Sequence, residues 1–83
     1  MDDKISVTTL FFSFAADRMS ARQIQVAISP GSTLGQFIEA ELQPKLGPES
    51  QNWLYSVNQE WAAKDRILQH GDEVAVIPPV SGG

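Results

Sequence analysis

The sequence contains no cysteine and a single histidine, His70. A chain without thiols can form no disulfide framework, thiolate metal site or cysteine nucleophile, and one histidine cannot assemble a metal site alone. Its hydrophobic runs fall far short of the ~20 residues that a membrane span requires. The acidic start, Met1-Asp2-Asp3, carries the wrong charge for a signal peptide. We therefore expect a cytoplasmic protein that binds neither a metal nor a membrane.

Basic residues are also scarce. Six lysines and arginines face ten aspartates and glutamates, so the formal net charge is −4. This balance argues against nucleic acid and anionic lipid as partners, because both require a positive surface. It permits a partner with a basic surface, such as an enzyme that binds phosphates. The 83 residues are enough for one globular domain.

The first third of the chain predicts a β-hairpin. Ile5–Phe14 is rich in β-branched and aromatic residues, and Arg22–Ile28 alternates apolar with polar residues, so both are expected to be strands. Ala15–Ala21 is expected to be the connecting loop. The end of the first strand is apolar on both faces, so this chain or a partner must cover Leu10 and Phe12. On the first strand, one face is expected to carry Ile5, Val7, Thr9 and Phe11, and the other Leu10, Phe12 and Phe14. On the second strand the expected inward side chains are Ile24, Val26 and Ile28.

One amphipathic helix is expected over Leu34–Gln43. Thr33 fits an N-cap, and Gln36 three residues later completes a capping-box pattern. Pro44 is expected to end the helix, followed by an irregular segment that leaves room for one short helical turn. The apolar stripe that should pack across the hairpin comprises Leu34, Phe37, Ile38 and Leu42.

The second half of the chain predicts a third strand and a tight turn. The strand covers Trp53–Val57, and a turn at Asn58-Gln59 leads into a short return through Glu60 and Trp61. Asparagine tolerates positive φ, which suits such a turn. Trp53 is expected in the core. The following loop should place Ile67 or Leu68 in the core, while His70 should be a solvated turn residue.

The last strand is expected over Glu73–Ile77, after a turn in which Gly71 supplies positive φ and Asp72 stabilises the geometry. Its continuous apolar run, Val74–Ile77, suits a central strand paired on both sides. A hairpin, one covering helix and a central final strand amount to an α+β, two-layer β-grasp fold. We expect this domain to span residues 1–77, with an extended tail over 78–83.

That tail is Pro78-Pro79-Val80-Ser81-Gly82-Gly83. Proline has a restricted φ and no N–H, so the pair should end sheet pairing and direct the chain outward as a stiff strut. The glycines can follow almost any backbone path. Such a segment suits delivery of the C-terminal carboxylate into a narrow pocket on another protein. The alternative is an ordinary disordered terminus.

The chain resembles the small subunit of molybdopterin synthase, a MoaD-type ubiquitin-like sulfur carrier. The resemblance covers nearly the whole sequence in order. Its weaker elements are Leu10-Phe11-Phe12 and Val57-Asn58-Gln59. Its specific elements are Gly71-Asp72-Glu73-Val74-Ala75 and Ile77-Pro78-Pro79-Val80-Ser81-Gly82-Gly83. The resemblance supplies the expected pairing order of the strands.

The resemblance implies chemistry at Gly83. In this family an enzyme of the ubiquitin-activating type uses ATP to adenylate the terminal carboxylate, and a sulfur donor converts the product to a thiocarboxylate. The tail, Pro78 to Gly82, then enters the active site of the large synthase subunit, where the sulfur passes to cyclic pyranopterin monophosphate. The chain itself would bind no cofactor and have no active site of its own. The tail carries no charged side chain, so burying it adds little desolvation penalty.

Phe12, Trp61 and Ile77 are expected on the sheet face away from the helix. Exposed together, they would form a larger apolar patch than a soluble monomer usually leaves open, and the resemblance places them at the contact with the large subunit and the activating enzyme. Alternatively, Phe12 or Trp61 completes a small second core. Other functions left open are a thiamin-type or other ubiquitin-like sulfur carrier, a protein modifier joined to lysines through Gly83, and a plain interaction module.

Overall fold

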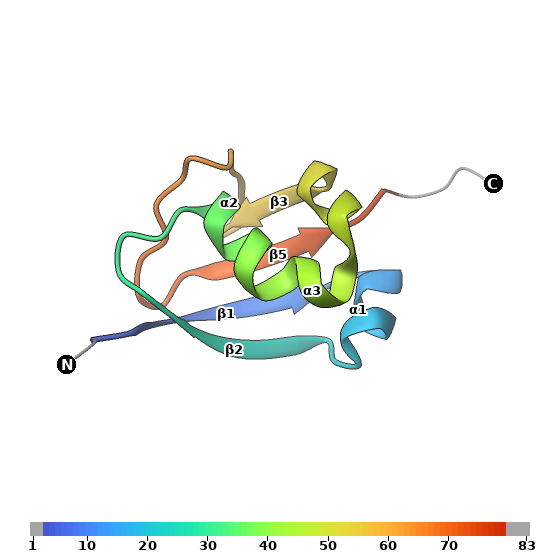
Figure 1. Cartoon of the computed structure of the whole chain (residues 1–83), viewed down its shortest axis with the longest axis horizontal. Helices are drawn as coiled ribbons and strands as arrows, with labels where there is room; N and C mark the ends of the chain where they lie inside the picture. Colours follow the sequence, from blue (N-terminus) through green and yellow to red (C-terminus); the bar gives the residue numbers. More distant parts are fainter. Residues whose placement is uncertain (1–2, 80–83) are drawn as a thin grey trace.

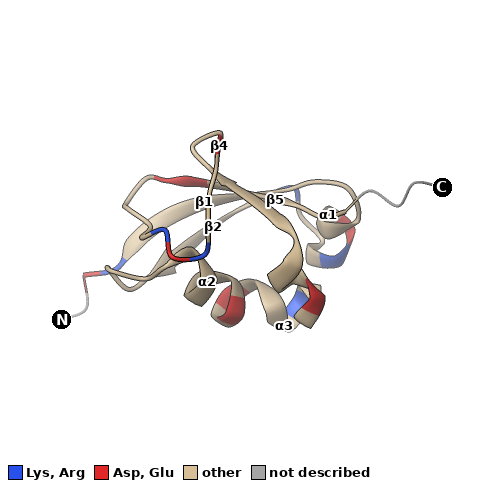
Figure 2. Cartoon of the chain, turned by 90° about the horizontal axis from the view of Figure 1, so that it is seen from above, with Lys and Arg blue, Asp and Glu red and all other residues tan. Residues whose placement is uncertain are grey.

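The computed structural model describes residues 3–79. These form a mixed five-stranded sheet with helices packed against one face (Figures 1 and 2). The strand order is β2-β1-β5-β3-β4, so the last strand in sequence is the central one. The strands are β1 (Ile5–Phe11), β2 (Gln23–Ile28), β3 (Leu54–Val57), β4 (Glu60–Trp61) and β5 (Glu73–Ile77). This is the α+β β-grasp arrangement expected from the sequence, and that prediction is confirmed.

The pairing of β1 and β2 confirms the predicted hairpin. The strands are antiparallel, with Val7 opposite Val26. β5 lies parallel to β1 and antiparallel to β3, which accounts for its apolar run because both of its edges are paired. The turn between β3 and β4 also forms as predicted. Asn58 and Gln59 have φ values of 53° and 68°.

The segment between β1 and β2 corrects the sequence interpretation. Instead of a loop, it contains a six-residue helix, α1 (Phe14–Met19), and β1 ends at Phe11 rather than Phe14. Ser13 precedes α1 with φ 55° and ψ −141°, and Ala15 within it is completely buried. The helix has only six residues, too few for an apolar periodicity to mark it in the sequence. Burial of Ala15 and contacts made by neighbouring side chains stabilise it instead.

The main helix begins as predicted and ends later than predicted. Thr33 and Gln36 form the capping box at the start of α2 (Leu34–Phe37). The helical path then continues through a π-helical turn, η1 (Ile38–Leu42), into α3 (Gln43–Leu46). Pro44 therefore does not end it. In the wider turn the N–H of Gln43 donates to the carbonyl of Ile38, five residues back. Proline is tolerated when such a turn interrupts the regular ladder, here near the start of α3.

The core lies between the helices and the inner face of the sheet. Its completely buried members include Leu34 and Leu42 from the helix and Val7, Val74 and Val76 from the sheet. Trp53 is buried, as predicted. Leu68 is the core residue of the following loop, whereas Ile67 is 51% exposed. The segment after α3 forms a short 3-10 helix, η2 (Pro48–Asn52), in agreement with the expected single turn.

Candidate functional site: the outer face of the sheet and the root of the tail

The sheet face away from the helices, here called the outer face, carries large apolar side chains. Strand register brings its residues together: Ala75 on β5 lies between Leu10 and Ser56, and Leu54 lies opposite Ile77. Trp61 on β4 lies opposite Ser56. Phe12 follows directly after β1 and donates its N–H to the carbonyl of Val76 over 3.3 Å. The apolar members of the outer face are Leu10, Phe12, Leu54, Trp61, Ala75 and Ile77.

Exposure distinguishes the two interpretations of these side chains. Phe12 is 49% exposed and Trp61 is 68% exposed, so neither completes a second core within the described residues. Ile77 is half-buried. Leu54 is 60% exposed and was not predicted as a surface residue. The alternation of Trp53, Tyr55 and Val57 inward on β3 would have placed Leu54 outward, so the strand period contained the information.

The described start of the tail, Pro78 and Pro79, is here called the root of the tail, and it lies at the end of this face. β5 ends at Ile77, immediately before the two prolines that were predicted to end sheet pairing. Pro78 is buried and Pro79 is exposed. A recess of about 190 Å³ beside them is lined mainly by Trp53, Leu54, Ile77 and Pro78. The predicted site residues Val80, Ser81, Gly82 and Gly83 lie outside the described residues.

Aromatic and cationic contacts hold α1 beside this root. The ring of Phe14 meets that of Trp53 edge to face, with ring centres 5.4 Å apart. The guanidinium of Arg18 lies 4.9 Å from the centre of the Phe14 ring. Trp53 also lines the recess next to Pro78. The helix absent from the sequence prediction is therefore connected by two aromatic rings to the place where the tail begins.

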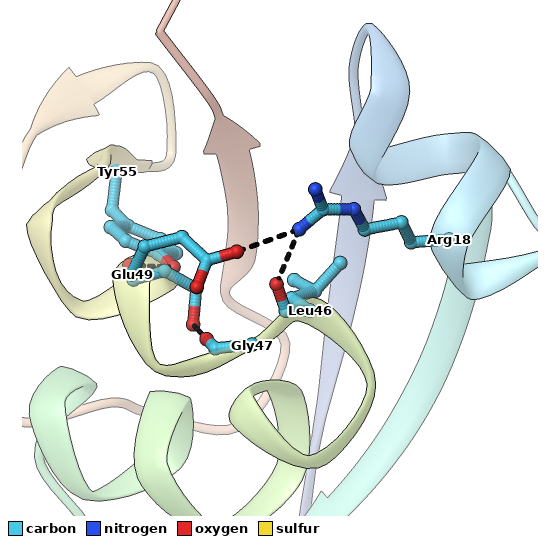
Figure 3. Close-up of polar contacts among 6 residues, drawn as sticks. Arg18, Leu46, Gly47, Glu49 and Tyr55 are labelled. Atoms are coloured by element: carbon cyan, nitrogen blue, oxygen red, sulfur yellow. Dashed lines mark hydrogen bonds and ion pairs between the residues drawn. The ribbon is translucent and has the colours of Figure 1, made fainter.

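Arg18 also connects α1 to the end of the main helix (Figure 3). Its Nη1 donates to the carbonyl oxygen of Leu46 over 2.7 Å and to Oε1 of Glu49 over 2.9 Å. The first bond satisfies a carbonyl at the C-terminal end of α3. A hydrogen bond from its own backbone, and then the bond from Arg18, hold the pKa of the Glu49 carboxyl below its usual value. Both charged side chains are solvent-exposed, so the pair orients the elements more than it stabilises them.

Tyr55 connects β3 to η2, the short helix that follows α3. Its hydroxyl donates to the carbonyl of Ser50 over 2.7 Å (Figure 3). Burial raises the pKa of the Tyr55 phenol to about 12. The phenol therefore stays protonated at neutral pH and keeps η2 fixed against β3.

Asp72 and His70 have the structural roles that the sequence predicted. Asp72 is buried, accepts hydrogen bonds from the side chain of Asn58 and the backbone of Gln69, and so stabilises the turn before β5. His70 is exposed and accepts a hydrogen bond from the N–H of Ser6. Across residues 3–79, no cluster of three potential metal-ligating side chains occurs. None of the helices described there is long and apolar enough to cross a membrane.

Residues 11–83 match the ThiS family. The chain belongs to this family. It is a ubiquitin-like sulfur carrier of the ThiS and MoaD type. The molybdopterin synthase sulfur carrier subunit of Arabidopsis thaliana is 27% identical over 81 residues, covering 95% of this chain and 84% of the plant protein.

Solved structures share the fold of this chain. SAMP1 from Haloferax volcanii superimposes with a TM-score of 0.82 and 27% identity, covering 94% of this chain and 99% of the archaeal one. A chain from the complex of subunits 1 and 2 of the molybdopterin-converting factor of Helicobacter pylori 26695 superimposes with a TM-score of 0.64. That match has 23% identity, covers 95% of this chain and 100% of the other, and speaks to the fold alone.

Proposed function

We propose that this ThiS-family protein is the sulfur-carrier subunit of molybdopterin synthase, with the sulfur carried as a thiocarboxylate on Gly83. The observation that carries the proposal is the exposed apolar outer face beside the root of the tail. A subunit that inserts its last residues into a partner needs both a docking surface and a tail that starts next to it. The named function of the plant relative, which aligns over 95% of this chain, supports the same assignment.

The proposed chemistry requires activation of the Gly83 carboxylate, because a carboxylate is a poor electrophile. One of its oxygens attacks the α-phosphorus of ATP in an activating enzyme of the ubiquitin-activating type, and pyrophosphate leaves. A sulfide equivalent from a sulfur-donor protein then attacks the acyl carbon and AMP leaves, taking the attacking oxygen with it. The resulting thiocarboxylate sulfur is nucleophilic without any cysteine. It attacks a carbon of cyclic pyranopterin monophosphate bound in the large subunit, and the carbon–oxygen bond at that carbon breaks as the carbon–sulfur bond forms, so that the oxygen leaves with the bonding electron pair. Water then cleaves the acyl–sulfur bond and regenerates the Gly83 carboxylate.

The proposed large-subunit contact consists of Phe12, Trp61 and Ile77, now joined by Leu54. Aromatic side chains are enriched at the centres of protein interfaces, where removal of one commonly weakens binding strongly. The bacterial structure that shares this fold is a complex of two subunits of a molybdopterin-converting factor, which supports a large subunit as the partner. The activating enzyme would use the same face at a different time.

Reconstitution tests the proposal directly. The chain is incubated with an activating enzyme, ATP and a sulfur donor, and intact mass is expected to rise by the difference between one sulfur and one oxygen atom. Addition of a large subunit and cyclic pyranopterin monophosphate should then yield the sulfurated pterin. Deletion of Gly83 should abolish both steps and leave the melting temperature unchanged. Sulfur transfer by the shortened chain would refute the tail mechanism.

The docking surface is tested by Trp61→Glu, with Ile67→Glu as its matched control. Both side chains are large, apolar and more than half exposed, and Ile67 lies on the loop that pairs with Thr33 rather than on the outer face. Trp61→Glu should weaken binding of the large subunit by about 2 kcal/mol or more, as for a central interface residue. Ile67→Glu should leave binding unchanged. Equal effects of the two substitutions would exclude Trp61 from the interface.

A second candidate function is protein modification, in which Gly83 forms an amide with lysines of other proteins. It is favoured by the similarity to SAMP1, a small archaeal modifier protein, whose 27% identity equals that of the plant carrier. Higher-mass conjugates in cell extract that disappear on deletion of Gly83 would support it. A thiamin-type carrier would acquire the thiocarboxylate but fail to convert the pterin with the large subunit.

A further inference from the structure

A cleft of about 500 Å³ lies between α1 and the adjoining ends of β1 and β2. Two of its walls, Leu10 and Phe12, belong to the outer face, so the cleft continues the apolar surface rather than standing apart from it. Ser13 and Ala16 form the wall on the α1 side, and Arg22 and Gln23 form the opposite rim. We call it the α1 cleft. α1, which forms one wall of this cleft, lies at the end of the molecule where β5 finishes (Figure 1).

The α1 wall is firmly held. Ser13 adopts φ 55° with ψ −141°, a backbone conformation that normally suits glycine alone and costs roughly 1–3 kcal/mol in other residues. Burial of Ala15, the contact of Phe14 with Trp53 and the hydrogen bond from Arg18 to Leu46 keep α1 in place despite that strain. Strained residues of this kind cluster at ligand clamps. The wall is therefore preformed, and an incoming group would not have to order it.

The rim carries charge available for a partner. Within residues 3–79 the pair between Arg18 and Glu49 is the sole ion pair, so Arg22 has no carboxylate partner there. Its guanidinium is one of few positive groups on a chain with a net charge of −4. Asp17 contributes a carboxylate on the α1 side of the same cleft. Guanidinium groups form strong two-bond contacts with carboxylates, which favours an acidic partner for Arg22.

From these features we infer that the α1 cleft receives an apolar side chain of the large subunit, flanked by an acidic residue that pairs with Arg22. This inference rests on the proposed function, because the large subunit is the partner that it names. The apolar side chain would contact Leu10 and Phe12, and the acidic residue would approach from the β2 side. The cleft would then fix the orientation of the docked sheet beside the tail.

The first test measures the dissociation constant between the full chain and the large subunit for Arg22→Glu. Lys45→Glu is the matched control, because it makes the same change in net charge on an exposed residue of α3, across the sheet from the outer face. Loss and reversal of a close charge pair should weaken binding about tenfold or more, whereas the control should change it less than threefold. Equal affinities for the two variants would overturn the inference.

A second test fills the cleft. Gln23→Trp adds a large side chain at its rim, and Ala27→Trp adds the same side chain on the same face of β2, about 13 Å further along the strand. Both positions are exposed, so both variants should fold, which melting curves verify. We expect at least tenfold weaker binding for Gln23→Trp than for Ala27→Trp. If Gln23→Trp binds the large subunit as tightly as Ala27→Trp does, the cleft does not take part in binding and the inference is wrong.

Asp17→Asn tests whether the partner residue at the cleft is acidic. Removing this carboxylate should leave binding as tight as in the wild type or tighter, because Asp17 would repel the acidic residue assigned to Arg22. Weaker binding would reverse the polarity and overturn the inference. Failure of the proposed function gives a different result: the wild type would not bind the large subunit at all, which would overturn both proposals. If Trp61→Glu weakens binding while Arg22→Glu and Gln23→Trp do not, the cleft inference alone fails.

Discussion

Replacement of Thr9 by valine should stabilise this domain. Thr9 is completely buried on the inner face of β1, opposite Ile24 on β2 and Val74 on β5. Its hydroxyl is the one buried side-chain polar atom within residues 3–79 that has no hydrogen-bond partner. Valine has nearly the same shape and the same branching at Cβ, so the strand conformation and the packing should be preserved.

The magnitude follows from the penalty for burying an unpaired hydroxyl. Mutational data place that penalty at roughly 1–3 kcal/mol, and exchange for a methyl group removes it without opening a cavity. A gain of 1 kcal/mol in a domain of this size corresponds to a rise of about 4–8 °C in melting temperature. We therefore expect Thr9→Val to raise the free energy of unfolding by about 1 kcal/mol or more.

Urea unfolding followed by the fluorescence of buried Trp53 measures this change, with the denaturant slope expected to stay the same. Thr8→Val is the matched control one residue away on the opposite face. The Thr8 hydroxyl accepts a hydrogen bond from Nε2 of Gln25 over 2.8 Å, so its removal should cost up to about 1 kcal/mol. If Thr9→Val is no more stable than the wild type, the hydroxyl has a partner or the site does not tolerate valine, and the reasoning fails.

Two other changes test local features. Ser13→Gly should raise the free energy of unfolding by about 1 kcal/mol, because glycine adopts the backbone conformation of Ser13 without strain. Ser20 has an ordinary left-handed conformation, so Ser20→Gly should raise the free energy of unfolding by less. Chemical unfolding of both variants measures the difference. Tyr55, the single tyrosine, has its pKa raised to about 12 in the folded state, so its contribution to stability is complete below the unfolded value of 10 and is lost as pH rises through 12. Tyr55→Phe should therefore remove this loss of stability at alkaline pH. A titration of tyrosinate absorbance in the folded protein with a midpoint near 10 would contradict the raised pKa of Tyr55.

The elements set by short-range patterns could be predicted from the sequence. β-branched and aromatic content identified the β1 strand, alternation identified the β2 strand and its inward residues, and the capping box located the start of α2. Asparagine and glycine marked the two turns with positive φ, at Asn58 and Gly71. In each case the deciding interaction lies within a few residues along the chain, so local residue identity is sufficient.

The elements stabilised by distant residues could not be predicted. α1 depends on burial of Ala15 and on contacts of Arg18 with the carbonyl of Leu46, 28 residues away in sequence. A proline would end a regular α-helix, but here a π-helical turn accommodates Pro44. The helical path continues to Leu46, whose side chain is completely buried. Packing energy in both places outweighs local preference.

For the candidate site, the sequence by itself determined which side chains are apolar, that the last strand is central, and that two prolines follow it. Only the tertiary structure decided which of those side chains remain exposed. Strand register across β3, β4 and β5 places Leu54 and Trp61 on the outer face beside Ile77, and docking of α1 forms a cleft next to Phe12. The physical reason is that exposure depends on which other elements cover a residue, and those elements come from distant parts of the chain.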